Sequence, residues 1–259
     1  IHIFNKNDFS YLTSIGNFGE GPEEITVMGC LAIDEAHHQL YVSDHAKQKI
    51  FSYDMDSVMV DSLYKPQVKT AMNETLFPSE YQYINDTLSI AVLIKPTSTS
   101  TFNQFLGRWN MNTGEMIPMK YTHPDIQKKR ITFAASEKAG IYVECYTRHD
   151  LMTICSLDGE LLYNIYGPDW DGGNGNKLQS FGTVMIGNDK IFVSYCGEDY
   201  ARDSFPTKIL VFDLEGNYLK TLETGYKISD CCYDSFNNRI ILSLNDVVQF
   251  AYLDIDGII

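Results

Sequence analysis

Residues Phe212-Asp213-Leu214-Glu215-Gly216-Asn217 carry the pattern that decides the fold. A strand ends in an aromatic or apolar residue, and a turn rich in Asp, Asn and Gly follows it. Such turns supply the positive φ angles that tight hairpins need. The same pattern recurs along the whole chain. Its other instances are Ile3–Asp8, Phe51–Asp56, Trp109–Glu115, Cys155–Glu160 and Tyr252–Gly257.

The spacing of these segments predicts an all-β, six-bladed β-propeller that forms a single domain over residues 1–259. Propeller blades recur every 40–50 residues or so, with loop insertions. A β-sandwich is the alternative, but repeats with the same internal order favour radial repetition. The anchors Phe4, Tyr53, Trp109, Cys155, Phe212 and Tyr252 are separated by 49, 56, 46, 57 and 40 residues.

Each blade is expected to contain four antiparallel strands, A to D, with the anchor at the end of strand C. Paired A and B strands precede most anchors, and they are apolar on both faces, as strands packed between neighbouring blades should be. These pairs are Leu31–Asp34 with Gln39–Ser43, Ile131–Ser136 with Ile141–Cys145, Thr183–Ile186 with Lys190–Tyr195, and Ile228–Tyr233 with Arg239–Leu244.

Two features of the pattern concern the chain ends and the connections. The first blade is incomplete, with only C and D strands over 1–4 and 11–15, and the last stops within its D strand. We therefore expect the natural chain to extend beyond Ile1. Short helices are expected only at Val68–Leu76 and His123–Arg130, both between blades.

Composition excludes several classes of protein. The chain has 20 Lys and Arg against 34 Asp and Glu, a net charge of −14, which argues against nucleic-acid and anionic-membrane binding. No apolar run approaches the roughly 18–20 residues that span a bilayer. Four of the six cysteines, Cys145, Cys155, Cys196 and Cys231, lie in apolar strands and are interpreted as buried small hydrophobes. A bridge between strands stays an alternative.

The segment Ile15–Ile25, which contains Gly19-Glu20-Gly21-Pro22-Glu23, gives a family resemblance. It resembles the Gly-x-Gly-Pro-x-Glu-aromatic segment of six-bladed propeller proteins abundant in Bacteroidetes, although Ile25 stands where an aromatic is usual. Those proteins are grouped with TolB-like and NHL-type propellers and are often exported lipoproteins. The resemblance implies a fold and export, and it carries no agreed catalytic residues.

The B–C loops and D–A crossings of a propeller lie on one face, which is the default place for a ligand. Charged and aromatic residues decorate these connections here, and Trp170 is interpreted as an exposed ring that can stack on a sugar or a partner. The candidate ligand-binding residues are Asp44, His45, Arg148, His149, Trp170, Glu198, Asp199 and Arg202.

The crossing around Trp170 also contains Asp169, Asp171 and Asn174 within a Gly-rich stretch. Oxygen-rich, flexible loops of this kind suit Ca²⁺. An ordinary exposed turn is the favoured interpretation, because Asp, Asn and Gly runs are typical of turns. No other cofactor is expected.

The favoured function is a non-enzymatic binding module for a protein, peptide or glycan, exported to the periplasm or cell surface. Contact with a membrane is expected only through a lipid anchor upstream of this sequence. No catalytic residues are assigned, since the chain lacks the Gly-x-Ser-x-Gly, His-Glu-x-x-His and Walker motifs. The alternative is a metal-dependent lactonase or lyase resembling the gluconolactonase and streptogramin-lyase propellers.

Overall fold

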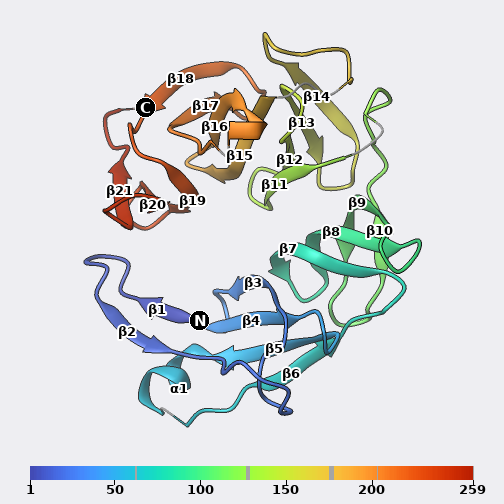
Figure 1. Cartoon of the computed structure of the whole chain (residues 1–259), viewed down its shortest axis with the longest axis vertical. Helices are drawn as coiled ribbons and strands as arrows, with labels where there is room; N and C mark the ends of the chain where they lie inside the picture. The colour runs from blue at the N-terminus through green and yellow to red at the C-terminus, as the bar shows by residue number, and fades with distance from the viewer. Residues whose placement is uncertain (62, 127–128, 175–177, 203, 259) are drawn as a thin grey trace. The chain divides into compact units, whose positions relative to one another are not determined.

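A computed structural model describes the whole chain except residues 62, 127–128, 175–177, 203 and 259. The chain divides into two compact units, Ile1–Met119 and Lys120–Ile259. Strands form nearly all of the regular structure of the described residues (Figure 1).

The first unit contains one two-stranded and two four-stranded antiparallel sheets. The short sheet pairs β1 (His2–Phe4) with β2 (Tyr11–Ser14). The next sheet contains β3 (Met28–Asp34), β4 (Gln39–Asp44), β5 (Lys49–Asp54) and β6 (Gln67–Ala71). The third contains β7 (Phe77–Asn85), β8 (Leu88–Pro96), β9 (Phe102–Trp109) and β10 (Met116–Pro118).

The second unit contains two four-stranded sheets and one three-stranded sheet. The first is β11 (Ile131–Ser136), β12 (Ile141–Tyr146), β13 (Leu151–Ser156) and β14 (Leu161–Tyr166). The second is β15 (Leu178–Gly187), β16 (Lys190–Asp199), β17 (Lys208–Asp213) and β18 (Tyr218–Glu223), with a 3-10 turn at Tyr200–Arg202. The third is β19 (Ile228–Asp234), β20 (Arg239–Leu244) and β21 (Phe250–Asp254).

The strands follow the expected repeat. In chain order, each sheet pairs every strand with the next one. Five anchor residues lie at or next to the ends of β1, β5, β9, β13 and β17, and the sixth, Tyr252, lies two residues before the end of β21. The hairpin between β15 and β16 shows why the turns have their composition: Asn188 and Asp189 have φ of 48° and 54°. Two consecutive positive φ angles are the geometry of a type I′ turn, which joins strands with their natural twist.

Apolar cores lie between neighbouring sheets within each unit. In the second unit, the β15–β18 sheet packs on β11–β14 through Val143 and Val193, and on β19–β21 through Val211 and Ile240. Figure 1 shows it between these two neighbours. In the first unit, the β3–β6 sheet packs in the same way on β7–β10 and on the β1–β2 pair. This explains why the inner strands are apolar on both faces.

The expected helices are wrong. Gln67–Ala71 is strand β6, which pairs with β5, and the described part of 123–130 has a turn at 124–125 and otherwise no regular secondary structure. The one α-helix of the described residues is α1 (Met55–Val60), directly after an anchor. The Asp54 carboxylate accepts a 2.7 Å bond from the Ser57 N–H and so caps this helix. The turn residue of the repeat therefore starts a helix here.

Two further expectations concern β16 and the cysteines. β16 continues to Asp199, beyond the expected end at Tyr195, so Glu198 and Asp199 lie in a strand rather than in a loop. All six cysteines are free thiols, and Cys145, Cys155, Cys196 and Cys231 are buried, which confirms their interpretation as small core residues. Within the described residues, no helix is both long and apolar enough to cross a membrane.

Candidate functional site

Four rings, three from connections and one from the end of strand β14, meet in the second unit. They are His123, His149, Tyr166 and Trp170, which we call the His–Trp cluster. The Trp170 ring lies 5.1 Å from Tyr166, 5.5 Å from His123 and 6.0 Å from His149, all between centroids. These inclined arrangements are the favourable ones for aromatic pairs. Trp170 is half-buried rather than fully exposed as expected, whereas Tyr166 at the end of β14 is 50% exposed.

The buried His123 is held by hydrogen bonds at both ring nitrogens. Nδ1 accepts from the Asp125 N–H at 3.3 Å, so the neutral ring carries its proton on Nε2. That nitrogen lies 3.1 Å from the Tyr166 hydroxyl oxygen, to which it donates. Burial lowers the pKa of His123, although Asp125 opposes the effect. The ring therefore supports the cluster as an uncharged aromatic at neutral pH.

His149 supports the other side of Trp170. Its residue exposure is 6%, and its Nδ1 has no hydrogen-bond partner. The nearest carboxylate oxygen, Oδ1 of Asp171, lies 3.8 Å away, beyond hydrogen-bond distance. Burial lowers the pKa of His149, with Asp171 opposing the effect. An unpaired buried nitrogen costs free energy, so this position favours any polar group that reaches it.

Asp150, next to His149, holds the crossing that carries Trp170. Its side chain is buried, and Oδ2 accepts from the Asp169 N–H at 3.0 Å. Its own carbonyl accepts from the Gly167 N–H at 2.9 Å. A β-carbon on Gly167 would lie 2.1 Å from Asp150 Oδ2, so only glycine fits there. Burial raises the pKa of Asp150, which receives a single backbone N–H bond in partial compensation.

Asp171 and Asn174 form the polar rim beside the His–Trp cluster. Asp171 Oδ1 accepts from the Gly173 N–H at 3.2 Å, and Asn174 Nδ2 donates to the Asp171 carbonyl at 2.8 Å. This is the turn geometry that Asp and Asn favour. Among the described residues, no group of three or more His, Cys, Asp or Glu side chains is arranged to hold a metal. Calcium binding by Asp169, Asp171 and Asn174 stays a prediction.

Asp44 and His45 lie in the first unit. The Asp44 carboxylate is fully buried and accepts four backbone N–H bonds, from Thr26, Val27, Ala46 and Lys47. Its oxygens are therefore engaged in holding the crossing before β3. His45 is half-buried, its ring lies 6.0 Å from Phe77, and burial lowers its pKa. His45 Nε2 is a buried nitrogen without a hydrogen-bond partner, as is His149 Nδ1, and ligand binding by Asp44 and His45 stays a prediction.

The remaining candidates also lie in the second unit. Glu198 and Asp199 pair with Gln179 and Leu178 across the β15–β16 ladder. Arg202 is exposed in the 3-10 turn, and Arg148 is half-buried in the connection that carries His149. Of the candidates from sequence, the structure brings together His149, Trp170 and Asp171, with Asp169 bonded to Asp150.

Sequence reasoning missed Tyr166 and the role of Asp150. Tyr166 ends a strand whose outward face is largely exposed, and 43 residues separate it from its partner His123. The one available signal for Asp150 was Gly167, a glycine directly after strand β14. Such an isolated glycine often marks a close approach of another group to the backbone.

Comparisons with known proteins support this fold. The family model described as a 6-bladed beta-propeller, DUF5128, matches residues 1–146. No curated protein matches the chain. Together with the sheets above, the match confirms an all-β propeller of four-stranded antiparallel blades and the resemblance to Bacteroidetes propellers.

Solved structures are similar at low identity. The extracellular domain of BT4673, a proposed one-component system from B. thetaiotaomicron, is 14% identical with a TM-score of 0.55, over 90% of this chain and 28% of that one. A Bacteroides caccae protein of unknown function is 13% identical with a TM-score of 0.55, over 99% and 86%. XC5397, a gluconolactonase from Xanthomonas campestris, is 12% identical with a TM-score of 0.46, over 86% and 84%. At such identities the first two matches indicate a shared fold alone, and the TM-score of the third is too low to support any conclusion.

Proposed function

Because the chain belongs to this family of 6-bladed beta-propellers, we propose that it is a non-enzymatic, exported module that binds a glycan at the His–Trp cluster. The observation that carries the proposal is the pair of partly exposed rings, Tyr166 and Trp170, backed by two buried histidines. The apolar faces of sugar rings stack on such aromatic surfaces, since stacking removes C–H groups from water while the hydroxyls stay hydrated.

The surroundings of the rings suit a sugar. The Asp171 carboxylate accepts hydrogen bonds, and the exposed Asn174 amide both donates and accepts them, as sugar hydroxyls require. The Trp170 loop is fixed at its start by Asp150 and Gly167 before a ligand arrives. A site held in place in advance loses less entropy on binding.

The test is binding of a panel of soluble polysaccharides and their oligosaccharides, followed by titration calorimetry and intrinsic fluorescence. Trp170 and the buried Trp109 are the two tryptophans of the chain, so Trp170→Phe identifies which one reports binding. We expect Trp170→Ala to weaken binding by more than about fivefold, equivalent to about 1 kcal/mol.

Tyr163→Ala is the matched control, because Tyr163 is an exposed aromatic on β14, the strand that ends at Tyr166, and takes no part in the cluster. The Tyr163→Ala variant should bind the glycan with the same affinity as the unaltered chain. An unchanged affinity of Trp170→Ala, or a partner that proves to be a peptide or protein bound elsewhere, would contradict the proposal.

Two finer proposals concern architecture and location. The four-stranded sheets, together with the three-stranded and two-stranded sheets, make six blades of one domain over residues 1–259. The protein is held at the periplasmic or outer cell surface by a lipid anchor. For the architecture, we expect a crystal structure to show all sheets around one axis. For the location, we expect the protein to fractionate with the cell envelope. Two separate bodies or a cytoplasmic pool would overturn them.

A further inference from the structure

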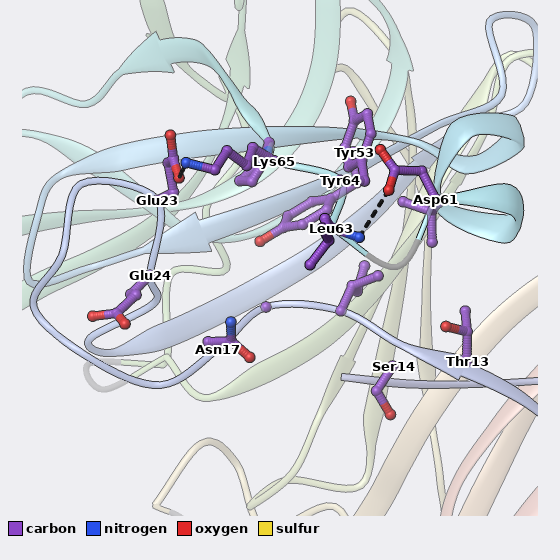
Figure 2. A pocket seen from close by; sticks show the side chains of 14 residues that line it. Thr13, Ser14, Asn17, Glu23, Glu24, Tyr53, Asp61, Leu63, Tyr64 and Lys65 are labelled. Atoms are coloured by element: carbon purple, nitrogen blue, oxygen red, sulfur yellow. Dashed lines mark hydrogen bonds and ion pairs between the residues drawn. The ribbon is translucent and has the colours of Figure 1, made fainter.

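Besides the His–Trp cluster of the second unit, the structure contains a cavity of about 410 Å³ in the first unit (Figure 2). Its wall comes from the end of β2 and the crossing after it, from β5, and from α1 and the segment that follows. A volume of this order is in the range of small-molecule sites. All of the lining residues belong to the first unit.

Tyr53 in the cavity wall has an unusual hydroxyl. The residue is 1% exposed, and its hydroxyl oxygen has no hydrogen-bond partner. Burial, and then the nearby Tyr64, raises the pKa of Tyr53 to about 12. The phenol is therefore neutral at physiological pH, and it can both donate and accept. Leaving such a group unpaired is costly, so a ligand oxygen that pairs with it gains affinity.

Gly16, also in the wall, lies next to this hydroxyl and adds no side chain that would cover it. A β-carbon on Gly16 would lie 3.4 Å from the Tyr53 hydroxyl oxygen, 3.6 Å from Ile25 Cγ1 and 3.9 Å from Ile1 Cδ1. The φ of +71° at Gly16 disfavours any side chain at this position.

The rim of the cavity carries both hydrogen-bond donors and acceptors. Figure 2 shows Lys65 directed at Glu23, with 2.8 Å between Nζ and Oε2. Asp61 Oδ1 accepts from the Leu63 N–H at 2.9 Å, and a second carboxylate oxygen of Asp61 remains for a ligand. With Glu24, the lining has three carboxylates against one ammonium group, which disfavours an anion.

The cavity also has an apolar part, formed by the buried Val58, by Ile15 and by the ring of Tyr64. A ligand that fits must present apolar C–H surface and several hydroxyls together. Lys65 pairs with Glu23, and the Glu24 carboxylate accepts from the Gly21 N–H, so the Asp61 carboxylate is available to accept from ligand hydroxyls.

We propose that this cavity binds a neutral polyhydroxylated molecule of mono- or disaccharide size, with one ligand oxygen paired to the Tyr53 hydroxyl. The site is separate from the His–Trp cluster and does not depend on the function proposed for it. Ring C–H groups pack on Val58 and Tyr64, and ligand hydroxyls bond to Asp61 and to the Glu23–Lys65 pair.

The experiment is saturation-transfer NMR and calorimetry on the whole chain. The neutral probes are glucose, galactose, mannose, N-acetylglucosamine, maltose and lactose, with choline as a cation and glucuronate as an anion. We expect at least one neutral sugar to bind. Tyr53→Phe should weaken this binding about fivefold, the loss of one hydrogen bond. It should fold normally, because the substitution removes an unpaired buried hydroxyl.

Tyr81→Phe is the matched control, since Tyr81 is a buried phenol of the same unit whose hydroxyl also lacks a partner but which does not line the cavity. The Tyr81→Phe and Trp170→Ala variants should both bind the neutral sugar with the affinity of the unaltered chain. The proposal is overturned if no neutral sugar binds, if only choline or glucuronate binds, or if Tyr53→Phe binds like the unaltered chain. Loss of the sugar in Trp170→Ala alone would assign binding to the His–Trp cluster and would also overturn it.

Discussion

Asp44 and Asp150 lie at opposite ends of the connection between the second and third strands of their sheets, Asp44 at the end of β4 and Asp150 directly before β13, and their surroundings differ. Both side chains are buried, with residue exposures of 0% and 3%. Asp44 accepts four backbone N–H bonds, and its Oδ2 lies 3.9 Å from the Lys47 ammonium nitrogen. Asp150 accepts a bond from the Asp169 N–H.

The pKa values move in opposite directions. Burial raises the pKa of Asp44, but its backbone N–H bonds outweigh burial and hold the pKa below 3.8. Burial raises the pKa of Asp150, and its bond to Asp169 does not compensate. A buried Asp in the same connection of two sheets is therefore fully hydrogen-bonded in one unit and an under-bonded carboxylate next to His149 in the other. Under-bonded buried groups are typical of functional sites.

The largest expected effect is that of Asp44→Ala. Four N–H groups lose their acceptor, so we expect the free energy of unfolding to fall by roughly 3–5 kcal/mol. Because the folded-state pKa is depressed, the stability contributed by Asp44 is complete above pH 3.8 and is lost as the pH falls through the folded-state value. Urea unfolding from neutral to acid pH measures this. An effect below about 1 kcal/mol would remove the contrast with Asp150.

Gly167→Ala tests the close packing that positions Trp170. The new methyl group would lie 2.1 Å from Asp150 Oδ2, so the carboxylate or the loop must move. We expect a loss of about 1–3 kcal/mol. The double variant Gly167→Ala/Asp150→Ala removes the collision, and thermal unfolding of the full cycle should show strong coupling. Additive effects would show that the two residues do not interact.

Asp150→Asn should have the opposite sign to Asp44→Asn. The raised pKa means that the ionised Asp150 destabilises the fold increasingly as the pH rises from 3.8 through the folded-state value. The amide keeps an acceptor for the Asp169 N–H and carries no charge, so we expect a gain of about 1 kcal/mol at neutral pH. Asp44→Asn should lose stability under the same conditions. If the melting temperatures of Asp150→Asn and Asp44→Asn changed in the same direction, the comparison would be contradicted.

The smallest expected effect is a pH dependence at His149. Its pKa is lowered in the folded state, so the fold loses stability as the pH falls from the ordinary value of 6.5 through the folded-state value. His45 and His123 act in the same direction. His149→Gln should lessen the loss by less than about 1 kcal/mol. An unaltered slope of melting temperature against pH would show that His149 titrates normally.

The repeat of strand ends was predictable because it depends on local chemistry. An apolar residue followed by an Asp, Asn or Gly turn ends a strand wherever it occurs, as at Phe212 and Trp109. The helix after Tyr53 was not predicted, because the same Asp that makes a turn also caps a helix, and Asp54 does the latter. The segment at Val68 has apolar residues at helical spacing, but pairing with β5 overrides it.

The candidate site was predictable only in part. His149, Trp170 and Asp171 were identified from residue type and position in connections. Their grouping with Tyr166 and His123 depends on how three segments pack, which no local pattern specifies. The cavity beside Tyr53 was missed for the same reason. Its key feature is a buried Tyr53 hydroxyl without a hydrogen-bond partner, and this depends on how several segments pack.

The most direct test is NMR of the chain with an oligosaccharide that binds, observing the Asp carboxyl carbons and the Trp indole signals. We predict that the signals of Asp150 and Trp170 shift on binding while that of Asp44 stays in place. We also predict that Asp150 titrates above 3.8 and Asp44 below it. Shifts at Asp44 with none at Asp150 and Trp170 would contradict the assignment of the site.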